Sequence, residues 1–101
     1  MFVKLVEAGS MIEALRAVSE AEPVVRVVPC KCGADMEIGY VIAPGALWIA
    51  TSTHFNQRLF GMIAVRSMDA LEASADFYGE MHIPMQEIRS AMAQCLTKVQ
   101  A

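Results

Sequence analysis

Residues 24–66 decide the fold, and they read VVRVVPCKCGADMEIGYVIAPGALWIATSTHFNQRLFGMIAVR. Four apolar runs of strand length lie in this stretch: Val24–Pro29, Met36–Ala43, Ala46–Thr53 and Phe60–Arg66. Pro44-Gly45 separates the second run from the third, because Pro pre-sets the first central residue of a turn and Gly accepts positive φ. The stretch therefore predicts an antiparallel meander of four strands.

The flanking segments predict one further strand and three helices. Phe2–Glu7 is a short apolar run, and Ser10 with Glu13 forms a capping box that starts a helix running to about Ala21. A second helix is expected from the cap at Ser67 or Asp69 towards Met81, and a third from Pro84 to about Val99. We expect one α+β domain over 1–101, ordered strand, helix, four-stranded meander, helix, helix, with the helices on one face of the sheet.

Side-chain alternation divides the central strands into two faces. We expect the face with Met36, Ile38, Tyr40 and Ile42 to form the core. The opposite face carries small residues around one Trp, which is uncommon for a face in contact with water. Trp is enriched at the centres of protein interfaces, and small neighbours let a partner approach closely. We therefore predict a partner interface formed by Trp48, Val41, Ala50 and Gly39.

Composition favours association with another protein and argues against nucleic acid. Hydrophobic residues make up 55% of the chain and charged residues 19%, against about 25% charged in typical soluble domains. An isolated copy would have trouble covering that much apolar surface, so a homo-oligomer or a protein partner is expected. The net charge is −3 and the eight basic residues are scattered, whereas phosphate-backbone binding needs clustered cations.

A membrane location is not expected. Residues 38–57 carry no charge, but Pro44-Gly45 divides them into two runs that are each too short to cross a bilayer. The apolar run in Met1–Glu7 is too short for the core of a signal peptide. The three cysteines are then expected to be reduced thiols in a cytoplasmic protein.

Two further groups of residues suggest alternative chemistry. Cys30 and Cys32 flank a single lysine at a turn and resemble half of a zinc knuckle, and His54 could supply another ligand. The structural alternative is that Cys30 ends a strand as a small hydrophobic residue while Cys32 occupies the turn. His54 could also act as a general base beside Tyr40; otherwise it is a loop residue.

The sequence lacks a phosphate loop, a nucleophile elbow and a paired Cys-x-x-Cys motif. Our first hypothesis is therefore a small acidic, non-enzymatic binding or inhibitory module that acts through a protein–protein interface, is homodimeric and needs no cofactor. The alternatives are a metal- or ligand-binding protein that uses Cys30, Cys32 and His54, with zinc as the metal, or a small enzyme with dispersed catalytic residues near Tyr40 and His54.

Overall fold

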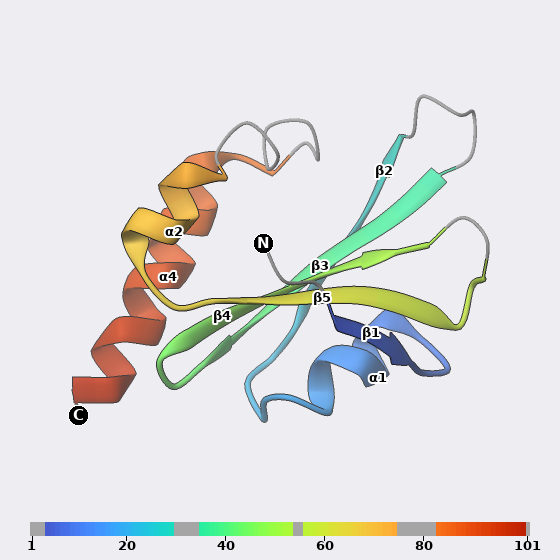
Figure 1. The fold of residues 1–101 in the computed structure, drawn as a ribbon, viewed down its shortest axis with the longest axis horizontal. Helices are drawn as coiled ribbons and strands as arrows, with labels where there is room; N and C mark the ends of the chain where they lie inside the picture. The colour runs from blue at the N-terminus through green and yellow to red at the C-terminus, as the bar shows by residue number, and fades with distance from the viewer. Residues whose placement is uncertain (1–3, 30–34, 54–55, 75–82, 101) are drawn as a thin grey trace.

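The computed structural model describes residues 4–29, 35–53, 56–74 and 83–100 (Figure 1). Its order of strand, helix, four strands and two helices confirms the predicted α+β class and the predicted order. The elements are β1 (Lys4–Glu7), α1 (Met11–Arg16), β2 (Val24–Pro29), β3 (Asp35–Ala43), β4 (Ala46–Ser52), β5 (Leu59–Val65), α2 (Met68–Ala73) and α4 (Met85–Gln100).

The strands form one antiparallel sheet in the order β1-β5-β4-β3-β2. The meander supplies four neighbouring strands, and β1 joins the free side of β5 with Lys4 opposite Met62. The hairpin between β3 and β4 turns at Pro44-Gly45, where Gly45 has a φ of 78°, a conformation that a residue with a Cβ rarely adopts. The turn chemistry read from the sequence therefore sets the register of the two central strands.

One face of the sheet packs against α2 and α4. Ile38, Tyr40 and Ile49 lie in this core beside Ile88 and Met92 of α4. The face predicted to form the core therefore does form one. The helix seam fits it because Ile88, Met92 and Cys95, spaced four and three residues apart, are each 0% exposed.

The other face is covered by α1, so the expectation that all helices lie on one face was wrong. Figure 1 shows α1 across the sheet from α2 and α4. Met11 and Leu15 of α1 form a second core with Val41 and Ala50. The physical reason lies at Gly39, where the absence of a Cβ lets α1 approach; a Cβ built there would come within 2.9 Å of the Leu15 Cδ1 atom.

The helix starts follow the predicted caps, whereas two helix ends fall earlier than predicted. Ser10 Oγ accepts a hydrogen bond from Glu13 N at 3.2 Å, as a capping box requires, while Glu13 Oε2 accepts one from Gly9 N at 3.0 Å, one residue before the cap. The first helix ends at Arg16 because Ser19 Oγ donates to Ile42 O at 2.6 Å and so fixes the connection on β3.

Ser67 caps α2 by accepting from Ala70 N at 3.1 Å. The helix ends at Ala73, before the predicted end near Met81. Residues 75–82, on which the rest of that prediction falls, lie outside the described residues, as do 1–3 at the start of the predicted first strand.

Candidate functional site

The chain itself covers three of the four residues predicted to face a partner. Val41 and Ala50 are each 0% exposed and pack beneath α1, and Gly39 is buried against Val24 and Leu15. These three are therefore not available as a docking surface in this structure. Because these residues are small, α1 can pack closely against them.

Trp48, the fourth predicted interface residue, is only half-buried. It lies opposite Ala64 of β5 and borders the second core without being enclosed by it. Trp48 therefore lies beside the end of β5.

The register of β1 shows which backbone groups of β5 point to its side. Continuing that register places Ala8 opposite Arg58, and Arg58 O accepts a hydrogen bond from Ala8 N at 2.9 Å. In an antiparallel strand the backbone groups of alternate residues point to the same side. Steps of two from Arg58 lead to Phe60, Met62 and Ala64. The N–H and C=O of Ala64 therefore point to the β1 side of β5.

That side of β5 has no strand partner beyond Met62 among the residues that the structure describes. β1 pairs with Leu59–Met62, and β5 continues to Val65. Beyond Met62 the register of β1 leads to residues 1–3, which lie outside the described residues.

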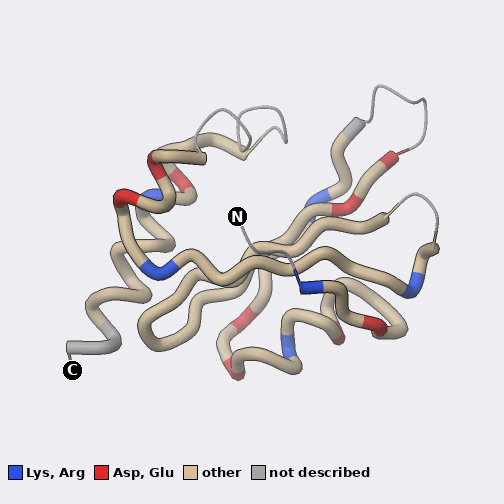
Figure 2. The backbone as a smooth tube through the Cα atoms, in the orientation of Figure 1, with Lys and Arg blue, Asp and Glu red and all other residues tan. Residues whose placement is uncertain are grey.

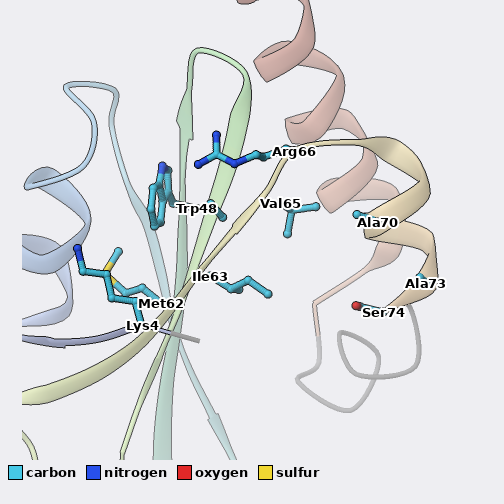
Figure 3. A pocket seen from close by; sticks show the side chains of 10 residues that line it. Lys4, Trp48, Met62, Ile63, Val65, Arg66, Ala70, Ala73 and Ser74 are labelled. Carbon is cyan, nitrogen blue, oxygen red and sulfur yellow. The ribbon is translucent and has the colours of Figure 1, made fainter. Parts of the chain in front are cut away.

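A cavity of about 630 Å³ lies at the end of β5 (Figure 3). Figure 3 shows Trp48, Met62, Lys4 and Arg66 on one side of β5, and Ile63 and Val65 on the other. Ala70 and Ala73 of α2, with Ser74 directly after it, complete the second side. The cavity thus contacts β5 from both faces of the sheet, with apolar walls and two cations.

The charges at the cavity are of one sign. Lys4 and Arg66 line it, and no described lining residue is acidic. On α2, the nearby Glu72 is already paired with Arg89, whose Nε lies 2.5 Å from Glu72 Oε1. Figure 2 shows the other basic and acidic residues dispersed over the elements. The cavity therefore favours an apolar ligand that carries a negative group.

A second polar cluster lies between α4 and the sheet. Arg26 Nη2 is 2.5 Å from Glu87 Oε1, and the Tyr40 hydroxyl donates to Glu87 Oε2. Glu87 and Tyr40 line a smaller cavity of about 430 Å³. Because each of the three side chains is bonded to another member of the cluster, its evident role is to hold α4 on β2 and β3.

Both acidic groups of this cluster titrate outside their ordinary ranges. Burial, followed by the hydrogen bond to the Glu87 carboxylate, raises the pKa of Tyr40 to about 12. The hydrogen bond from Tyr40, supported by Arg26, holds the pKa of Glu87 below its usual value. The cluster therefore keeps the phenol neutral and the carboxylate charged over the neutral range.

Glu87→Gln is expected to lower the free energy of unfolding at pH 7 by about 1 kcal/mol, since it weakens two charge-assisted hydrogen bonds at a partly exposed site. Because the pKa of Glu87 is lowered in the folded chain, its stabilisation is present above the ordinary value of 4.5 and is lost as pH falls through the lowered pKa. Urea unfolding from pH 7 to pH 3 should show wild type and Glu87→Gln converging in acid. Glu37→Gln, at an exposed position of β3, is the control; an equal gap at both pH values would contradict the assignment.

The residues predicted for metal binding cannot be placed. Cys30, Cys32 and His54 all lie outside the described residues. Within the described residues, no group of three or more His, Cys, Asp or Glu could hold a metal ion. The predicted pairing of Tyr40 with His54 is likewise untested.

The sequence reasoning missed Glu87 as the partner of Tyr40. The residue that could have pointed to Glu87 is Arg26, a single charge on the same strand face as Val24 and Val28. Val28 belongs to the core that α4 covers, and Val24 packs against that core. A cation inside an apolar strand needs a carboxylate opposite it.

None of the helices that the structure describes is long and apolar enough to cross a membrane. Comparisons with family models, curated proteins and solved structures find no match.

Proposed function

We propose that this chain is a small, acidic, non-enzymatic binding module that acts through a protein–protein interface at the cavity beside Trp48. The observation that carries the proposal is this cavity of about 630 Å³, whose described lining combines the half-buried Trp48 with apolar residues and the two cations Lys4 and Arg66. Trp is enriched at the centres of protein interfaces.

The covered sheet faces support this choice of surface. α1 packs on one face and α2 with α4 on the other, so a partner has the cavity at the end of β5 rather than the middle of a face to contact. A module that binds a surface of its partner also withholds that surface from other proteins, which is how this chain would inhibit a partner. A cytoplasmic location, expected from the sequence, remains a prediction.

Homodimerisation is the second candidate, and the low share of charged residues favours it. Two copies that meet at the cavity would bring Lys4 and Arg66 of both chains to one junction. Like charges at such a junction oppose pairing, so we place a different protein first. Light scattering after size-exclusion chromatography decides between them: a wild-type dimer that Trp48→Ala converts to a monomer would assign the cavity to a second copy.

Trp48→Ala is expected to weaken peptide binding at the cavity by about tenfold or more, equivalent to about 1.4 kcal/mol, because it removes an aromatic side chain from the cavity lining. Short random peptides would be selected by display on the wild-type chain, and their affinities for the variant then measured by calorimetry.

Val27→Ala is the matched control, since Val27 is 65% exposed and lies on β2, at the opposite edge of the sheet. Circular dichroism would confirm that both variants fold. Selected peptides that bind Trp48→Ala as tightly as wild type would place the interface elsewhere and overturn the proposal.

A further inference from the structure

We propose that two copies of this chain associate through the outer edge of β2, the edge that faces away from β3, with the two strands antiparallel and Arg26 of each copy opposite Arg26 of the other. This inference goes beyond the proposed function, because β2 lies at the other edge of the sheet from β1 and β5, which line the cavity. It follows from the backbone groups, the prolines and the charges along β2.

The direction of the backbone groups of β2 follows from Val24. Its carbonyl oxygen lies towards β3, because it comes within 2.8 Å of a Cβ built at Gly39. In an antiparallel strand the backbone groups of alternate residues point to the same side. Arg26 therefore also directs its N–H and C=O to β3, whereas Val25 and Val27 direct theirs to the outer edge.

The hairpin between β3 and β4 gives the same alternation. Its two-residue turn closes on the pair Ala43 and Ala46, and the first pair beyond such a turn exchanges backbone hydrogen bonds. Ile42 therefore points to the other side of β3, where its carbonyl oxygen accepts a hydrogen bond from Ser19 Oγ at 2.6 Å. Tyr40, two residues earlier, points to that side as well and so faces β2.

The outer edge of β2 is open to solvent. β2 is the last strand of the sheet, and no strand pairs with its outer edge among the residues that the structure describes. The side chain of Val27, in the middle of this edge, is 65% exposed. A strand edge with free N–H and C=O groups is a template for another strand.

Prolines at both ends of the outer edge select one register for a second copy. By the same alternation the outward positions include Pro23 and Pro29, which have no N–H. With Arg26 opposite Arg26, Val25 lies opposite Val27 of the second copy, and every N–H and C=O of these two residues finds a partner. A shift by two residues sets a proline opposite Val25 or Val27 and leaves a carbonyl group unpaired.

The side chains on both faces of this pairing suit a second copy. Val25 and Val27 share the α1 face, so the exposed Val27 packs against Val25 of the second copy. On the α4 face each Arg26 is already bonded to Glu87, whose Oε1 lies 2.5 Å from Arg26 Nη2. The two-fold axis therefore gathers equal numbers of cations and carboxylates, whereas two copies that meet at the cavity would bring together the cations of its lining.

Analytical ultracentrifugation of the full chain over a concentration series tests this inference, and wild type is expected to show a monomer–dimer equilibrium. Val27→Lys is expected to raise the dissociation constant of the dimer by about tenfold or more, because a lysine on an edge strand opposes pairing. Leu5→Lys is the matched control, since Leu5 is 58% exposed and lies on β1, at the other edge of the sheet. It should leave the dissociation constant unchanged.

Val27→Pro tests the backbone hydrogen bonds separately. The N–H of Val27 points away from β3, and proline is tolerated at such a position of an edge strand. The substitution removes half of the hydrogen bonds between the two copies, so the dimer should again weaken by about tenfold or more. In wild type, amide exchange at Val25 and Val27 should slow as the concentration rises, while exchange at Arg26, whose N–H faces β3, stays unchanged.

The outcomes separate this inference from the proposed function. A wild-type chain that is monomeric at every concentration overturns it, and so does a dimer that both Val27→Lys and Val27→Pro leave as stable as that of wild type. A dimer that Trp48→Ala dissociates and Val27→Lys does not would belong to the cavity, which also overturns the β2 interface. The loss of peptide affinity in Trp48→Ala tests the proposed function independently of these results.

Discussion

Leu15→Ala is expected to lower the free energy of unfolding by about 2–5 kcal/mol, the range for truncating a large aliphatic side chain in a core. Leu15 is 0% exposed and lies in the cluster that joins α1 to the sheet. The short helix has few other anchors, since it spans only Met11–Arg16. Truncating Leu15 weakens the contact of α1 with β3 and β4, so the midpoint of urea unfolding should fall.

Ile12→Ala is the matched control for this prediction. Ile12 lies on the same helix but is 41% exposed, so the same kind of truncation should cost well under half as much. Equal losses for Leu15→Ala and Ile12→Ala would contradict the placement of α1 on the sheet. A near-zero loss for Leu15→Ala would contradict it as well.

Gly39→Ala is expected to destabilise the chain by about 1–3 kcal/mol, as overpacking of a well-filled core does. An added Cβ would lie 2.8 Å from Val24 O and 2.9 Å from Leu15 Cδ1. The side chain of Leu15 can move, but Val24 O belongs to the backbone of the neighbouring strand. The substitution therefore forces β2 and α1 away from β3, and thermal unfolding should report it.

A double variant separates the two contacts of that Cβ. Combining Gly39→Ala with Leu15→Ala removes the clash with Cδ1 but keeps the clash with Val24 O. The loss of stability of the double variant should then be smaller than the sum of the losses of the two single variants, because residues in contact couple. Strict additivity would indicate that Leu15 does not lie against Gly39.

The strands were predictable because their signals are local. Val24–Pro29 lies where its apolar run placed it, and the Pro44-Gly45 turn fixed the hairpin that follows from it. The caps at Ser10 and Ser67 were legible for the same reason, since each satisfies amide groups within one turn.

The placement of α1 was not predictable, because it depends on which face a helix crosses after a loop. Small residues at Gly39, Val41 and Ala50 signalled close approach by something, and the sequence did not distinguish a partner from the chain's own helix. The cavity beside Trp48 was not predictable either, because its lining brings together Lys4, Trp48 and Ala70, which lie far apart in the sequence.

Trp48 fluorescence tests the central claim, that the cavity beside Trp48 takes a protein partner, most directly. Trp48 is the single tryptophan of the chain and lines the cavity, so its emission reports binding there. A peptide selected on the wild-type chain should change this emission in a saturable titration whose Kd agrees with calorimetry. A peptide that binds by calorimetry without changing the emission of Trp48 would contradict the account.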